Sequence, residues 1–462
     1  MVTQTRPTSS GIPTPTLART PPALSGGLPV IGHALEFGRD PLGLLHRARR
    51  ECGEVAGLKL AHKQMYLLTG AAANEAFFRA PDQQLSPHEA YKMMTPVFGK
   101  DVVYDAPPAR TGEQLGMLLP ALQDRRMRTY GEIVAGEVER SMAELGDEGT
   151  VDFIAYCARL TSFTSAHCLL GPEFRNELSD EFARVYYDLE KGIHPIGYLN
   201  PYLPIPSFRR RDKARVRLQE MIGGIVKSRQ KSGRTGEDFL QTLMDARYKS
   251  GAPLSDHEIT GMLLAAMFAG HHTSSVTTAW TMIELLRHPY YTRRVLAQLE
   301  QVFSPGTEVS YQLLRELTLV EWAVKEALRL HPPLFMLLRG VVEDFPYADY
   351  VFPRGSFLIV SPAVSHRIPE LFRNPERFDP DRFGPERQED RNHFNFISFG
   401  GGRHKCLGNA FALLQVKTIL AKLLTRYELA LGDDAIVSDL GAVVMGPKAP
   451  FRIHYQRRRW AS

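Results

Sequence analysis

The chain has 462 residues, of which 44% are hydrophobic and 23% charged, and its formal net charge is +5. These values are typical of a globular protein with a large core, and the charge is too small to favour a nucleic-acid partner. Four cysteines in this length give no disulfide framework, so we expect a soluble, cytoplasmic protein.

The chain is predicted to begin with a flexible lead-in, residues 1–26, which five prolines interrupt and which has no apolar core of a signal peptide. A short helix at 44–50 and two strands, Val55–Leu60 and Gln64–Leu68, follow. From about 113 to 335 the apolar periodicity predicts successive helices separated by short Pro or Gly breaks.

A second strand-rich part is predicted at 339–360, then a last helix from Leu407 and a terminal hairpin within 440–455. Residues 456–462 are predicted to be a solvated basic tail. No repeat or linker divides the chain, so we expect one mainly α domain with a small β portion over 27–455, rather than a doubly wound sheet.

The longest predicted helix covers about 256–288. Its stretch from Gly261 to Ile283 has no acidic or basic side chain, yet its histidines and threonines favour a helix through the protein interior over a membrane span. Ala269 and Thr273 lie on one face of small residues that could receive a flat ligand. The alternative is a close contact between helices.

Two histidines, His271 and His272, are adjacent on this helix. Neighbouring residues on a helix point apart, so the sequence predicts that these two do not chelate one metal ion. Histidine titrates near neutrality, and it can therefore transfer protons.

Cys406 lies in the run from Phe399 to Gly408, after three consecutive glycines and beside Arg403, His404 and Lys405. Positive charge and the start of a helix both favour a thiolate. Glycines let the backbone approach whatever the sulfur binds, which suits a cysteine that ligates iron. The alternative is a glycine loop that caps a helix and carries an incidental cysteine.

The run resembles the haem-binding signature of the cytochromes P450, which includes Phe399, Gly400 and Gly408. The resemblance implies the P450 fold, a single triangular-prism-like domain, and haem b with Cys406 as the axial ligand of its iron. Glu326 and Arg329 resemble the Glu-x-x-Arg motif of that family. By the same resemblance, Arg377 is expected to complete their buried network.

The segment Tyr91–Asp105 resembles that of sterol 14α-demethylases, and so does His272, which stands where most P450s have an acidic residue before the threonine. The resemblance implies oxygen activation at Thr273 and proton delivery by His272, with Glu190 as its partner. The implied reaction removes the sterol 14α-methyl group in three successive oxidations, each using O2 and two electrons. The methyl group leaves as formic acid, and a 14,15 double bond forms.

Matching positions imply the remaining site residues. The haem would contact Cys406, Tyr91, Arg339, His404, Phe399, Gly400, Gly408 and Ala269. The sterol would contact Met93, Phe98, Tyr104, Phe268, Ala269, Leu337, Leu338 and Val444. Two positions depart from the family: Gly112, with Arg110 nearby, replaces a lysine that contacts a haem propionate, and Met93 replaces a Phe or a branched aliphatic residue.

The resemblance also implies partners. We expect a monomer without a membrane span that accepts electrons from a ferredoxin or flavodoxin-type donor with its NAD(P)H reductase, near Arg403 and Lys405, and that binds azole inhibitors. One alternative is a P450 that hydroxylates another hydrophobic, terpenoid-like substrate. Another is a non-catalytic haem-binding or sterol-binding protein, which would have no need of a proton relay at Thr273 and His272.

Overall fold

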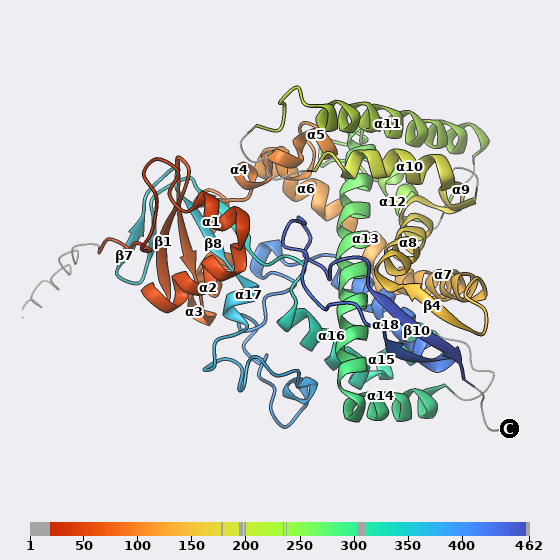
Figure 1. Cartoon of the computed structure of the whole chain (residues 1–462). Coiled ribbons are helices and arrows are strands. Elements are labelled where there is room, and N and C mark those ends of the chain that lie inside the picture. Colours follow the sequence, from red (N-terminus) through yellow and green to blue (C-terminus); the bar gives the residue numbers. More distant parts are fainter. Residues whose placement is uncertain are drawn as a thin grey trace, which may run out of the picture.

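The computed structural model describes residues 19–176, 179–193, 197, 200–233, 235–236, 238–303 and 310–458. Most of the predicted lead-in, up to residue 18, and the last four residues of the predicted basic tail lie outside these ranges. Figure 1 shows a small β-rich part beside a larger helical part. The prediction of a mainly helical chain is therefore confirmed.

The β-rich part is a five-stranded sheet in the order β1-β2-β8-β5-β3. Its strands come from both ends of the chain: β1 (Val55–Leu60), β2 (Lys63–Leu68), β3 (Leu85–Ser86), β5 (Leu337–Val341) and β8 (Phe357–Val360). The central strand β8 is the apolar run Phe-Leu-Ile-Val, and all four residues are buried because it is covered on both faces. Its antiparallel pairing with β5 places Arg339 opposite Leu358.

Short helices pack around this sheet, and a separate two-stranded ribbon lies at its edge. The helices are α1 (Ala34–Arg39), α2 (Pro41–Cys52), α3 (Ala71–Arg79), α4 (His88–Tyr91) and α17 (Pro362–Ser365). The short helix α5 (Thr95–Phe98) packs against the helical part instead. The ribbon joins β6 (Phe345–Tyr347) to β7 (Tyr350–Phe352). The sheet core formed by residues such as Leu67, Ile359 and Val360 is fully buried.

The helical part is built around α13 (Asp256–Arg287), which crosses the middle of the molecule in Figure 1. Ser255 and Glu258 form a capping box at its start, and His288-Pro289 ends it. Around it pack α6 (Pro108–Leu118), α7 (Asp124–Ala143), α8 (Phe153–Ser165), α9 (Pro172–Asn176), α10 (Ser179–Glu190), α11 (Pro206–Ser232), α12 (Phe239–Asp245), α14 (Pro289–Val302), α15 (Tyr311–Glu316), α16 (Thr318–Leu330) and α18 (Asn409–Arg426).

The helix α13 matches the predicted range 256–288 to within one residue at its end. Its apolar length is covered by other helices, with α8, α16 and α18 against its sides. Across the described ranges, no helix combines the length and apolar character that crossing a membrane requires.

The predicted hairpin within 440–455 is wrong. The last strand, β10 (Arg452–Arg457), lies between β9 (Tyr427–Leu431) and β4 (Glu148–Asp152) and pairs antiparallel with both. Strand β9 directly precedes β10 in the chain and β4 lies far from it, and together they satisfy the backbone groups of β10 on both sides. The strand also includes the first two residues of the segment predicted to be a tail.

Candidate functional site

The loop before Cys406 lies tightly against Phe78 of α3. Gly400 and Gly402 have φ of +67° and +56°, a region that residues with side chains rarely adopt. A Cβ on Gly402 would lie 2.3 Å from the carbonyl oxygen of Phe78, so this position has no room for a side chain. The backbone N–H of Cys406 donates to the carbonyl of Phe399 at 2.8 Å and closes the loop.

The Cys406 thiol lies just before α18. The residue keeps accessible surface, although the surrounding chain desolvates its thiol. This desolvation raises the pKa of Cys406, while the backbone N–H of Gly408 and the charge of Lys405 act in the opposite direction. The predicted effect of the positive charge and the helix start is therefore present, and desolvation of the thiol opposes it.

A face of small residues on α13 also keeps accessible surface. Ala269 is exposed and Thr273 is half-buried, while Met267 and Ser274 on the other faces are buried. The Thr273 hydroxyl donates to the carbonyl of Ala269 at 2.5 Å, the back-bond that a helical threonine can form. Helix α18 packs against this part of α13, since a Cβ on Gly270 would lie 3.6 Å from the Phe411 ring.

Arg339 is a buried cation with few partners. It is 3% exposed and donates one hydrogen bond, to the carbonyl of Phe77 at 2.6 Å. Burial lowers its pKa to about 10, and no carboxylate of the described chain forms an ion pair with it. A buried guanidinium with this surplus of donors is well suited to an anionic ligand.

Two tyrosines and a histidine lie within electrostatic range of Arg339. The rings of Tyr91 and Tyr104 stack with centroids 4.4 Å apart. Burial raises the pKa of Tyr104, negative charge on Cys406 raises it further, and Arg339 opposes both. A hydrogen bond of 2.6 Å joins Nε2 of His404 to Oδ1 of Asp82. The sequence did not suggest Asp82 as a partner of His404.

His272 and Glu190 are brought together as predicted. Their Nε2 and Oε1 atoms are 2.6 Å apart, where the end of α10 meets α13. His271 is buried and contacts Thr161 through Nδ1 at 3.0 Å. The rings of His271 and His272 are nevertheless only 4.4 Å apart, so the prediction that adjacent helix positions keep them apart is wrong. One ring nitrogen of each histidine and a carboxylate oxygen of Glu190 lie within 4.8 Å of one another.

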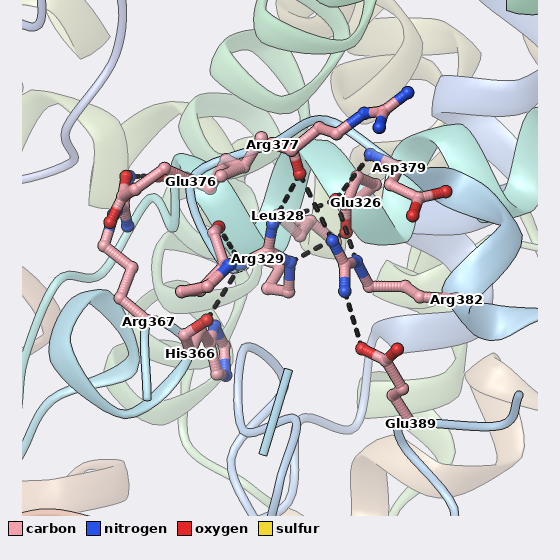
Figure 2. Close-up of polar contacts among 12 residues, drawn as sticks. Glu326, Leu328, Arg329, His366, Arg367, Glu376, Arg377, Asp379, Arg382 and Glu389 are labelled. Atoms are coloured by element: carbon pink, nitrogen blue, oxygen red, sulfur yellow. Dashed lines mark hydrogen bonds and ion pairs between the residues drawn. The ribbon is translucent and has the colours of Figure 1, made fainter. Parts of the chain in front are cut away.

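A fully buried network of charges joins α16 to the segment that leads to Cys406 (Figure 2). Arg329 donates to both carboxylate oxygens of Glu326, at 2.8 and 2.9 Å. Arg382 donates to Glu326 at 3.0 Å and also to Glu389 at 2.6 Å. Glu326, Arg329 and Arg382 have no exposed side-chain surface.

The prediction that Arg377 completes this network is wrong. Its backbone carbonyl accepts from Arg329 and Arg382, each at 3.2 Å, but its side chain is exposed and points away in Figure 2. Arg382 takes the predicted role because the short helical turn at Pro380–Phe383 aims it at Glu326. The pattern Asp381-Arg382-Phe383 was visible in the sequence, but nothing local separates the two arginines.

The sequence profile of the cytochrome P450 family matches residues 21–453. The chain belongs to the cytochrome P450 family. It is therefore an oxidoreductase of the monooxygenase class, as predicted.

Among its curated relatives, this P450 is 42% identical to "Sterol 14alpha-demethylase" of Mycolicibacterium vanbaalenii, over 96% of this chain and 99% of the relative. It is 39% identical to "Obtusifoliol 14-alpha demethylase" of Sorghum bicolor, over 96% and 91% of the two chains. It is 34% identical to "Lanosterol 14-alpha demethylase" of Bos taurus, over 96% and 89%. All three relatives are named for removal of the same methyl group.

Solved structures agree on the fold. The structure described as "Retinoic acid bound cyanobacterial CYP120A1" superposes with a TM-score of 0.85 at 24% identity, over 96% of this chain and all of the other. The structure described as "Crystal structure of cytochrome P450DA heme domain" gives the same TM-score at 20% identity, over 96% and 99%. The predicted P450 fold is therefore confirmed.

Membership of the P450 family implies haem with a cysteine thiolate ligand, and the residues of this chain fit that group. Cys406 keeps accessible surface after the glycine loop, and so does the small face of α13. Arg339 has no anionic partner among the described residues. A soft sulfur ligand, a flat face and a buried cation match iron, a porphyrin plane and a propionate.

Arg110 does not replace the lysine charge that the family has at the position of Gly112. Arg110 donates to Glu258 at 2.6 Å and stacks over the ring of Tyr248, so its guanidinium is held at the start of α13. A Cβ on Gly112 would meet nothing within 4 Å. The charges of Arg339 and Arg403 act on each other.

The residues expected to contact the sterol come from separate elements. Met93 and Phe98 are each 6% exposed, and Phe98 packs against Phe268 with ring centroids 6.3 Å apart. Met445 donates from its backbone to the carbonyl of Pro333 at 2.8 Å, which holds the loop around Val444 beside the start of β5. The half-buried members of the set are Tyr104, Phe268, Leu337, Leu338 and Val444.

Proposed function

We propose that this P450 removes the 14α-methyl group of a sterol by three successive oxidations, each consuming O2 and two electrons. The observation that carries the proposal is the hydrogen bond between His272 and Glu190, beside Thr273. A proton-carrying pair at this point of α13 is the feature that sets the implied reaction apart from general P450 chemistry. The names of the relatives support the same choice.

The residues that would hold haem b are distributed around its expected plane. Cys406 would ligate the iron, while Tyr91 and Arg339 would hold the propionates. His404, which donates from Nε2 to the Asp82 carboxylate, would join them through Nδ1–H when both of its ring nitrogens are protonated. Phe399, Gly400, Gly408 and Ala269 would contact the ring. When bound, the haem supplies the activation of O2, and the chain supplies binding, orientation and protons.

Proton delivery is the task of three side chains. Glu190 is 16% exposed and His272 30%, so protons can reach this pair from solvent. His272 passes a proton toward Thr273, one residue further along the helix. The Thr273 hydroxyl donates a hydrogen bond to the carbonyl of Ala269, and its oxygen lone pairs can accept a hydrogen bond. In a relay this hydroxyl takes up one proton and releases another, so it carries no net charge.

The substrate proposal rests on the apolar set from separate elements. Met93, Phe98, Phe268 and Val444 offer no charge, and a flat sterol buries a large apolar surface against such residues. Azoles are expected to bind in the same place, with a ring nitrogen toward the iron and the apolar body among these side chains.

The electron donor is proposed to be a ferredoxin or a flavodoxin-type protein, served by its NAD(P)H reductase. A cleft of about 530 Å³ lies beside Gly112. Arg247, Lys249 and Arg403 line it, against one carboxylate, Glu113. A cationic cleft next to the Cys406 loop is complementary to an acidic redox protein.

The test has two steps. The purified, haem-loaded protein is first reduced under carbon monoxide, and a thiolate-type absorption band is expected. It is then supplied with lanosterol or obtusifoliol, a ferredoxin, its reductase and NADPH. The 14-desmethyl product and one equivalent of formate per sterol are expected. A normal carbon monoxide band without sterol turnover would contradict the sterol proposal, and no thiolate-type band would contradict the role of Cys406.

A further inference from the structure

Three side chains that can ligate a metal converge where α10 meets α13. One ligand atom each from Glu190, His271 and His272 lies within 4.8 Å of the other two. We infer that these residues form a binding site for a divalent transition-metal ion, with Zn²⁺ as the best match, and that the bound metal blocks proton transfer through His272. The inhibitory part rests on the proposed function, whereas the binding part does not.

The spacing is close to what zinc requires. Ligand atoms about 2.0–2.1 Å from a tetrahedral zinc ion are roughly 3.3 Å from one another. His272 Nε2 and Glu190 Oε1, now 2.6 Å apart, must separate slightly to admit the ion. Every pair of these ligand atoms lies within 4.8 Å, so the widest separation must shrink by at most about 1.5 Å, a movement on the scale of side-chain rotation.

Hydrogen bonds fix the tautomer of His271. The Thr161 hydroxyl donates to the carbonyl of Cys157 at 2.8 Å, so its oxygen is left to accept from His271 Nδ1 at 3.0 Å. Nδ1 therefore carries the proton, and Nε2 presents a bare lone pair to which no described residue donates. A ring nitrogen bonded in this way is how proteins orient a histidine that ligates a metal.

Charge and burial favour the same ligand state. Burial lowers the pKa of His271 to about 3, so its imidazole stays neutral, as metal binding requires. Glu190 supplies one negative charge against the divalent ion, and two imidazoles with one carboxylate form a known zinc-ligand set that leaves a fourth position for water. Since His272 and Glu190 keep some exposed surface, an ion can reach them from solvent.

The metal and the relay proton compete for the same atoms. The proton that His272 and Glu190 share lies between Nε2 and Oε1, the atoms that face the ion. Zinc binding must displace this proton from between the two atoms. An occupied site therefore leaves His272 unable to pass protons toward Thr273.

The binding test is Zn²⁺ titration of the haem-loaded full chain, without sterol, by calorimetry. We expect one site. His271→Asn keeps a donor toward Thr161 but has no Nε2, and it should weaken the affinity roughly ten-fold or more. The matched control is His454→Asn, because exposed His454 also contacts a threonine, Thr150 at 2.7 Å, far along the chain in β10.

Equal affinity in wild type and His271→Asn would overturn the inference, as would loss of the site in His454→Asn. The second arm measures sterol turnover with and without Zn²⁺. We expect inhibition in wild type and at least ten-fold less sensitivity in His271→Asn. Zinc bound at His271 without any sterol turnover would contradict the proposed function while leaving the metal site intact.

Discussion

His272 on α13 and Glu190 on α10 share a hydrogen bond of 2.6 Å, although 82 positions separate them in the sequence. Helices α11 and α12, with their connecting loops, lie between α10 and α13 in the chain. The pair places an exchangeable proton one residue from Thr273, where α10 meets the middle of α13. The proton relay therefore depends on the docking of one helix against another.

Breaking this pair should slow turnover without affecting the haem. Removal of a positioned proton donor costs typically 10²–10⁴-fold, so we expect Glu190→Gln and His272→Ala to lower kcat by at least about 10²-fold. The carbon monoxide spectrum should stay of the thiolate type. Turnover in H2O and D2O checks the result, with Tyr187→Phe, exposed on α10, as the control. An unchanged kcat in both variants would exclude a relay.

Arg382 and Arg377 should differ sharply in stability. Arg382→Gln leaves Glu326 and Glu389 with fewer buried partners, and breaking a buried ion pair costs about 3–5 kcal/mol. Arg377→Gln keeps the backbone carbonyl that the network uses, so a change within about 0.5 kcal/mol is expected. Urea unfolding and haem content measure both variants. Similar losses in the two would contradict the role assigned to Arg382.

Substitutions at Gly112 are expected to stabilise α6 and to slow the loss of haem. Gly112→Ala should stabilise α6 by about 1 kcal/mol, because glycine weakens a helix interior and a Cβ meets nothing within 4 Å. Gly112→Lys should add an exposed ion pair to a haem propionate, worth about 0.2–1 kcal/mol, and slow haem loss roughly two- to five-fold. Haem transfer to apomyoglobin measures the rate. If the alanine and lysine variants lose haem equally fast, the lysine makes no such contact.

The buried His271 should make the fold sensitive to acid. Its pKa falls from the ordinary 6.5 to about 3, because burial, and then the charge of His272, disfavour its protonated form. Between these two pH values the unfolded chain binds a proton that the folded chain does not. Stability contributed by neutral His271 is therefore complete above pH 6.5 and declines by about 1.4 kcal/mol per pH unit toward pH 3.

His271→Asn should remove this part of the acid sensitivity. The free energy of urea unfolding, compared at pH 7.0 and 5.5, is expected to fall by about 1.3 kcal/mol less in the variant than in wild type. His454→Asn, at an exposed position, should behave like wild type. Parallel losses in wild type and His271→Asn would show that His271 becomes protonated without unfolding.

Much of the fold could be predicted because its signals are local. The predicted range of α13 agrees with local signals: its apolar run, the capping residues Ser255 and Glu258, and the proline after His288. The β1 and β2 strands were equally legible from alternating residues and a polar turn. The prediction of a hairpin at 440–455 was wrong because both strands that pair with β10 lie outside that range. No local sequence pattern indicates which strand outside the range will pair.

By itself, the sequence determined the family and its chemistry. Cys406, its glycines and Thr273 lie in short runs, and the covalent chain sets the spacing within each run. Only the tertiary structure decided which partners the ionisable groups have. Arg382 rather than Arg377 reaches Glu326, Arg110 is held by Glu258, and His404 is held by Asp82. These pairs form between chain segments that packing brings together, and burial selects the side chains whose charges are matched.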